Sequence, residues 1–275
     1  MSWIKRLFRR DKKRKNHYGW FGNFQSWAEA KAGASGYETS TILEKTKNSL
    51  LKVKNGEAVY ERDSVLFDKK EYPYAVISAL LYIAIKNENK LHVIDFGGSL
   101  GSTWFQIRDF MPAQIELYWS IVEQPAYVQE GKTHFSDEVL DFYFSLDECI
   151  AARKKPDVVL LSGVLQYLEK PHDFLDQLSK FNVDYIVFDR TAFLKDNHED
   201  RLTLQRVPPE IYDAQYPSWF FNEQDFLKHF PNYTIKADFE PFVAGEQTMF
   251  IDHKPIAYDK GFLFERIKES IPPDL

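Results

Sequence analysis

The chain has 275 residues, of which 44% are hydrophobic and 28% charged, which suits one sizeable α/β domain with an appendage and argues against global disorder. Its single cysteine, Cys149, excludes an internal disulfide framework and a cysteine-based zinc site. The net charge is −6. Residues 1–16 hold eight Lys or Arg and one acid, Asp11, and so carry +7, which leaves −13 on the rest of the chain. A domain this acidic disfavours a nucleic-acid partner.

Residues 1–16 form a basic tail. On a helix, Ile4, Leu7 and Phe8 would share one side among arginines, a pattern that suits docking on an anionic membrane surface. A disordered solubilising tail is the alternative. The tail lacks the apolar region of a secretory signal, and the longest apolar run, residues 74–85, is too short to span a bilayer. We therefore expect a cytoplasmic protein, with peripheral contact at the inner membrane as a further hypothesis.

Residues 17–72 read as an N-terminal helical extension, with helical periodicity over residues 26–34 and 39–56. Arg62 and Asp63 near its end fit either a lid over a ligand or a simple cap. A main domain, residues 73–275, then opens with an apolar helix over residues 74–86.

Short apolar, β-branched runs alternate with helical stretches from residue 91 onward. The predicted strands cover residues 91–96, 116–122, 139–145, 157–163 and 184–190. The predicted helices between them cover residues 102–111, 125–135, 146–154 and 171–181. Strand and helix at this spacing predict right-handed crossovers and a parallel sheet with helices on both faces.

The pattern loosens after Arg190 into a long segment rich in Pro, Tyr and Asn. Two further strands, over residues 232–242 and 248–254, lie close together as in a hairpin. Five parallel strands and a closing antiparallel hairpin predict the Rossmann-like, seven-stranded sheet of class I methyltransferases. A dinucleotide-binding sheet would continue with a sixth parallel unit.

The first predicted strand ends at Asp95 and Phe96 and runs into a glycine-rich turn, "VIDFGGSLGS". Gly97 and Gly98 would let a ligand lie against the main chain, and Gly101 would allow close packing where the next helix begins. Ser102 and Thr103 are suitable N-cap residues for that helix. A tight turn without a ligand is the alternative interpretation.

The spacing of this turn discriminates between ligands. It departs from the G-x-G-x-x-G of dinucleotide folds and fits the acid-x-G-x-G-x-G turn of class I S-adenosylmethionine-dependent methyltransferases, with Ser99 in place of the middle glycine. A carboxylate at Asp95 would repel a pyrophosphate but can pair with the ammonium of a methionine moiety.

Polar or small residues also end the next strands. Glu123, followed by Gln124, can accept both ribose hydroxyls of a nucleoside, although a surface acid before a proline is the alternative. The third strand ends at Ser145, where an adenine edge would lie. The fourth ends at Ser162 and Gly163, whose small size leaves room for a sulfonium and an incoming acceptor.

Several stretches, among them "YGWFGNFQSWAEAKAGASGYETSTILEKT", "VIDFGGSLGST", "VEQPAYVQEGK", "LLSGVLQYLEKP" and "FDRTAF", together resemble a bacterial family of class I methyltransferases. Members of this family are often found among genes for surface-polysaccharide biosynthesis. The resemblance covers nearly the whole chain from Tyr18 but not the basic tail. It implies S-adenosylmethionine as the cofactor and a small or glycan-linked acceptor, without identifying that acceptor.

Three residues are candidates for a general base. Asp189 ends the fifth predicted strand, where it could face the acceptor or simply pair with Arg190. His198 lies on the following loop and His172 opens a helix, and each is also well explained as a structural histidine. The seven histidines are scattered without metal-ligand spacing, so no metal is expected.

Two other functions compete with methyl transfer. A nucleotide- or NAD-linked sugar-modifying enzyme is weakened by the missing G-x-G-x-x-G turn. A non-catalytic binding module on the same fold stays open, because Ser99 replaces a glycine and no base is certain.

Overall fold

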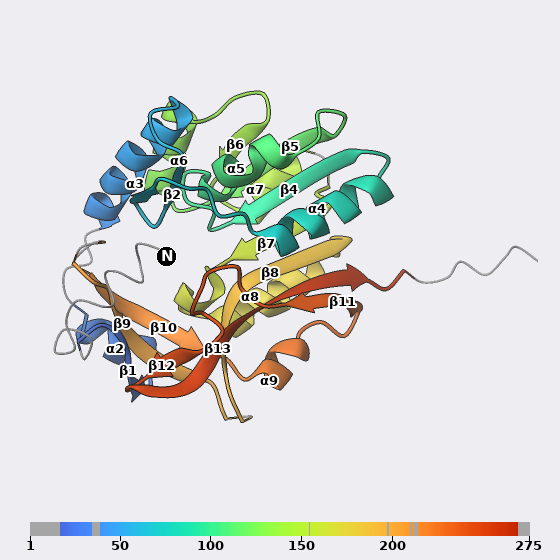
Figure 1. Ribbon diagram of the computed structural model, residues 1–275. Helices are drawn as coiled ribbons and strands as arrows, with labels where there is room; N and C mark the ends of the chain where they lie inside the picture. The colour runs from blue at the N-terminus through green and yellow to red at the C-terminus, as the bar shows by residue number, and fades with distance from the viewer. Residues whose placement is uncertain are drawn as a thin grey trace, which may run out of the picture.

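The computed structural model describes residues 17–34, 39–153, 155–196, 198–209, 211 and 214–268 (Figure 1). The basic tail lies outside these residues, so its contact with a membrane stays a prediction. In the part of the chain that is described, no helix has both the length and the apolar character needed to cross a membrane.

Five parallel strands form the centre of the main sheet. They are β4 (Lys90–Phe96), β5 (Glu116–Val122), β6 (Leu140–Tyr143), β7 (Val158–Ser162) and β8 (Tyr185–Leu194). Their order across the sheet is β6-β5-β4-β7-β8, and every neighbouring pair is parallel. Because strand order reverses at β4, the carboxyl ends of β4, β5 and β7 surround a topological switch point, where open α/β sheets bind ligands.

Two antiparallel pairings complete the seven-stranded arrangement. The long strand β13 (Lys254–Arg266) pairs antiparallel with β8, and β11 (Tyr233–Phe239) pairs antiparallel with β13. The Rossmann-like class I methyltransferase fold is thereby confirmed from the topology.

A strand is present within the predicted residues 248–254, but it is not the partner of β11. Met249–Ile251 is a separate short strand, β12, and a tight turn at Asp252 and His253, both with positive φ, reverses the chain into β13. The strand that closes the sheet is β13. Charged residues interrupt its apolar pattern, so the sequence does not predict it as a strand.

The sheet extends well beyond these seven strands. Past β13 follow β12, β1 (Gly19–Phe24), β9 (Arg201–Arg206) and β10 (Gln215–Phe220), which Figure 1 shows gathered at one end of the molecule. The long segment after Arg190, where the sequence pattern loosens, contains β9 and β10, which the sequence did not predict. The N-terminal segment also contributes strand β1, and Trp20 packs edge-on against Phe220 with ring centres 5.7 Å apart.

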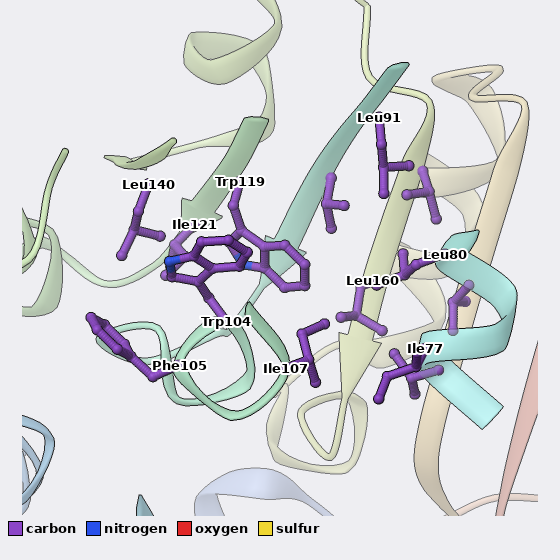
Figure 2. Close-up of a cluster of buried hydrophobic side chains, with 14 of the residues drawn as sticks. Ile77, Leu80, Leu91, Trp104, Phe105, Ile107, Trp119, Ile121, Leu140 and Leu160 are labelled. Atoms are coloured by element: carbon purple, nitrogen blue, oxygen red, sulfur yellow. The ribbon is translucent and has the colours of Figure 1, made fainter. Parts of the chain in front are cut away.

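Helices cover both faces of the parallel strands and bury two separate cores. The first face carries α3 (Thr39–Lys54), α4 (Tyr74–Lys86), α5 (Ser102–Ile107) and α6 (Pro125–His134). The second carries α7 (Leu146–Ala152), α8 (Pro171–Lys180) and α9 (Glu223–Leu227), while α2 (Trp27–Ala32) packs beside β9 and β10. In the first core, Trp119 of β5 lies against Trp104 of α5, with ring centres 5.6 Å apart (Figure 2).

A small hairpin, β2 (Tyr60–Arg62) and β3 (Val65–Phe67), is tied to the start of α5. The Glu61 carboxylate accepts hydrogen bonds from the Ser64 amide and the Ser102 hydroxyl, each at 2.7 Å. Ser102 therefore does not cap α5 as the sequence suggested. The N-cap position is Gly101, whose φ of 103° favours glycine.

The second core gives a direct test of this fold. Phe188 of β8 is fully buried among Phe226, Phe230 and Phe264. We expect Phe188→Ala to lower the free energy of unfolding by about 3–5 kcal/mol, because it removes buried surface and leaves a cavity. Guanidinium unfolding measures this loss. Phe250→Ala, at a side chain that is 51% exposed, is the control and should change stability by less than about 0.5 kcal/mol.

Candidate active site at the carboxyl edge of the sheet

The glycine-rich turn directly follows β4, as the sequence predicts. Gly97 has φ of 70°, and Ser99, at the position of the replaced middle glycine, has φ of 56°. Ser99 thus keeps the left-handed backbone despite its side chain. A Cβ on Gly97 would lie 2.3 Å from Val164 Cγ2, so this turn packs directly against the turn after β7.

The Asp95 carboxyl group lies beneath the same turn. A Cβ on Gly98 would lie 2.5 Å from Asp95 Cγ, so only glycine leaves room for the acid. Trp119 Nε1 donates a hydrogen bond of 3.1 Å to Asp95 Oδ2. Burial, with a smaller contribution from the charge of Glu123, raises the pKa of Asp95 to about 7, although the hydrogen bond from Trp119 opposes this shift. A cationic partner would therefore strongly stabilise the ionised form of Asp95.

Glu123 ends β5 beside this turn. Its carboxylate accepts a hydrogen bond of 2.6 Å from the Gln124 amide, and the Ser99 amide also faces it. Burial raises the pKa of Glu123, and these two amides oppose that shift. The Gln124 side chain is exposed at the N-cap of α6. The carboxylates at the ends of β4 and β5 are therefore brought together around one backbone turn.

Ser162 and Gly163 end β7 on the other side of β4. The Ser162 hydroxyl donates a hydrogen bond of 2.6 Å to Asp189 Oδ2, and burial raises the pKa of Asp189. Arg190 Nε lies 3.8 Å from the same carboxylate oxygen, so the predicted Asp189–Arg190 pair is present. Asp189 is 2% exposed, which limits its access to an acceptor in this conformation.

A bulge sets the direction of these two side chains. The register between β8 and β13 places Gly261 opposite both Asp189 and Arg190, and Arg190 has φ of 50°. Bulges of this kind re-aim side chains and are common next to active sites.

Two other predicted cofactor residues have local packing roles. The Phe96 ring packs against Phe174 of α8, with ring centres 4.4 Å apart. Ser145 is exposed, and its hydroxyl caps α7 by accepting a hydrogen bond from the Glu148 amide. Contact of either residue with a cofactor stays a prediction.

The two candidate histidines belong to a different cluster. His172 Nε2 lies 2.6 Å from Asp200 Oδ2, and its Nδ1 lies 2.8 Å from His229 Nε2. The hydrogen bond to Asp200 raises the pKa of His172. His198 is exposed, and its carbonyl accepts a hydrogen bond from Asn222. Both ring nitrogens of His172 are thus engaged in a structural network.

Sequence reasoning missed two acids near Arg190. Asp259 of β13 and Glu246, in the loop before β12, lie close together, and burial is the largest cause that raises the pKa of each, to about 7 for Glu246. The neighbouring residues in the sequence do not indicate that either acid lies near Arg190. That proximity arises only when β13 pairs with β8. Among the described residues, no group of three or more His, Cys, Asp or Glu side chains could hold a metal ion.

No protein-family model matches the chain, and no curated protein matches it. Three solved structures that do match are methyltransferases. A 1,6-didemethyltoxoflavin-N1-methyltransferase from Burkholderia thailandensis, with bound S-adenosylhomocysteine, is 11% identical over 85% of this chain and 91% of that one (TM-score 0.42). An amino pentose methyltransferase from Micromonospora echinaspora is 12% identical over 70% and 90% (0.43). A magnesium protoporphyrin IX methyltransferase from Synechocystis is 14% identical over 70% and 78% (0.40). Similarity at this level does not identify a cofactor or an acceptor.

The contact between Gly98 and Asp95 can be tested by one added methyl group. We expect Gly98→Ala to lower the free energy of unfolding by about 1–3 kcal/mol, because the methyl must displace the buried carboxyl group. Thermal and guanidinium unfolding measure the change. Gly33→Ala is the matched control, since its φ is −81° and an added Cβ would come no closer than 3.4 Å to a neighbouring atom, which is an ordinary contact. Equal stability of the two variants would contradict the packing described here.

Proposed function

We propose that this protein is an S-adenosylmethionine-dependent methyltransferase that acts on an oxygen or nitrogen of a small or glycan-linked acceptor, in surface-polysaccharide biosynthesis. One observation carries the proposal: a bare backbone turn at the switch point of the sheet, with the Asp95 and Glu123 carboxylates on either side. Two acids so placed disfavour a pyrophosphate and suit a nucleoside that bears a cationic arm.

The residues of this edge fit the cofactor. In the described part of the chain Asp95 accepts one side-chain hydrogen bond, from Trp119, so lone pairs remain for an ammonium group. Glu123 is half-buried beside the turn and would accept the ribose hydroxyls. Gly97 and Gly98 would let the cofactor lie against the main chain, with Ser162 and Gly163 beside the reacting group.

When bound, S-adenosylmethionine supplies a methyl group that its sulfonium has already activated. The chain must then align the acceptor and exclude water. For a hydroxyl acceptor we propose Asp189 as the general base, because it lies next to Ser162 and burial raises its pKa. His172 and His198 are weaker candidates for this role, since the first is held by Asp200 and His229.

The two acids can be tested separately by titration calorimetry with S-adenosylhomocysteine. We expect Asp95→Asn and Glu123→Gln each to weaken binding roughly 10- to 150-fold, the loss that follows from about 1.5–3 kcal/mol for a hydrogen bond to a charged group. Asp95→Asn keeps an acceptor for Trp119 and so should still fold.

Glu169→Gln, at an exposed acid near the same edge, is the control and should bind as the unchanged protein does. Absence of heat with millimolar ligand would contradict the proposed function. Tight binding of NADH would favour the sugar-modifying oxidoreductase, and binding without turnover on any glycan would favour a non-catalytic module.

The pKa of Asp95 also predicts a pH dependence. Below a pH of about 7 its carboxyl group is neutral in the free protein and must ionise before it pairs with an ammonium group. Affinity for S-adenosylhomocysteine should therefore rise as pH increases, by up to roughly tenfold per unit, and level off above the pKa. Methylthioadenosine lacks the ammonium group and should not show this rise, which calorimetry at several pH values would reveal.

A further inference from the structure

Two arginines from distant parts of the chain converge beside the end of β7. Arg62 ends strand β2, and Arg190 lies in the bulge of β8. The guanidinium carbons lie 6.0 Å and 5.9 Å from the centre of the same Phe242 ring. A Cβ on Gly163 would lie 2.9 Å from Arg190 Nη2, so this guanidinium covers the turn that follows Ser162.

Neither guanidinium is fully hydrogen-bonded by the described residues. Arg62 is only 9% exposed, yet its Nη1 has no hydrogen-bond partner, and the same is true of the buried Nε of Arg190. The nearest acids lie beyond hydrogen-bonding distance, with Glu71 Oε2 at 3.6 Å from Arg62 Nη1 and Asp189 Oδ2 at 3.8 Å from Arg190 Nε. Buried polar groups are nearly always hydrogen-bonded, so one guanidinium nitrogen of each arginine without a hydrogen-bond partner requires an explanation.

Two of the surrounding acids are hydrogen-bonded elsewhere, whereas Glu246 Oε2 and Asp259 Oδ1 also lack a hydrogen-bond partner among the described residues. Asp189 accepts from Ser162, and Glu61 accepts from Ser64 and Ser102. Burial raises the pKa of Glu246 to about 7 and also raises that of Asp259, so this close pair retains protons near neutral pH. Asp63 is exposed at the hairpin turn. Arg62 Nη1 and Arg190 Nε are thus left without a hydrogen-bond partner among the described residues.

We propose that Arg62 and Arg190 form an oxyanion subsite that binds a carboxylate or phosphate group of the methyl acceptor. The planar guanidinium matches either anion through paired N–H donors, and the Phe242 ring supplies an apolar wall. Because Arg190 covers Gly163, the anion would lie next to the place of methyl transfer. That this anion belongs to the acceptor rests on the proposed function; the anion-binding property itself does not.

Calorimetry with inorganic phosphate and with malonate, at constant ionic strength, tests the subsite and distinguishes the two anions. We expect one of them to bind the unchanged protein, and Arg62→Gln and Arg190→Lys each to weaken that binding at least tenfold. Arg190→Lys keeps the positive charge but removes the planar fork. Arg108→Gln, at an exposed arginine directly after α5, is the control and should leave anion binding unchanged. If neither anion binds, or if all three variants bind alike, the proposal is overturned.

Thermal unfolding separates a binding role from a structural one. The ion pair of Arg62 with Glu71 is 3.6 Å long and Glu71 is partly exposed, so the unfolding temperature of Arg62→Gln should be unchanged or higher. A lower unfolding temperature, together with unchanged anion binding, would show that Arg62 only supports the hairpin.

Titration with S-adenosylhomocysteine distinguishes failure of this inference from failure of the proposed function. Both arginine variants should keep their affinity for it. Anion binding without S-adenosylhomocysteine binding would contradict the methyltransferase proposal and leave the subsite intact. Binding of S-adenosylhomocysteine without binding of either anion would overturn the subsite alone.

Discussion

The buried carboxyl group of Asp95 is the constraint on which the carboxyl edge of the sheet depends. It requires glycine at position 98, a donor at Trp119 and a backbone turn that bends sharply over it. Because its pKa is raised, the free protein is stabilised while Asp95 is neutral, and that stabilisation is lost as pH rises through about 7. A cation bound at this point would reverse that loss, so ligand and fold are thermodynamically linked.

Segments far apart in the sequence complete the edge. The hairpin β2–β3 is tied to α5 through Glu61 and Ser102, and this contact places Arg62 near the end of β7. From the opposite direction, the bulge of β8 turns Arg190 toward Gly163. The sheet thus supplies the fixed backbone and the acids of the switch point, and its bulge supplies Arg190, while the hairpin supplies Arg62.

Local patterns predicted the central sheet and the glycine-rich turn well. Each of β4 to β7 is a short apolar run between polar residues, and Asp95, Gly97 and Gly98 are neighbours in sequence as in space. Strand β13 was missed because Asp259 and Lys260 interrupt its apolar pattern. The proximity of Glu246, Asp259 and Arg190 could not be foreseen either, because it depends on long-range pairing and on one bulge that no local pattern specifies.

Strand β1 has a consequence for how the molecule folds. It lies inside the sheet, between β9 and β12, and its hydrogen bonds reach partners 179 and 230 residues away, from Arg201 Nε to the Gly22 carbonyl and from the Gly22 amide to Asp252. Contacts of such high sequence separation slow folding, because a long loop must close before they form. The extension of the sheet should accordingly assemble late, after the parallel strands around β4 have provided a platform.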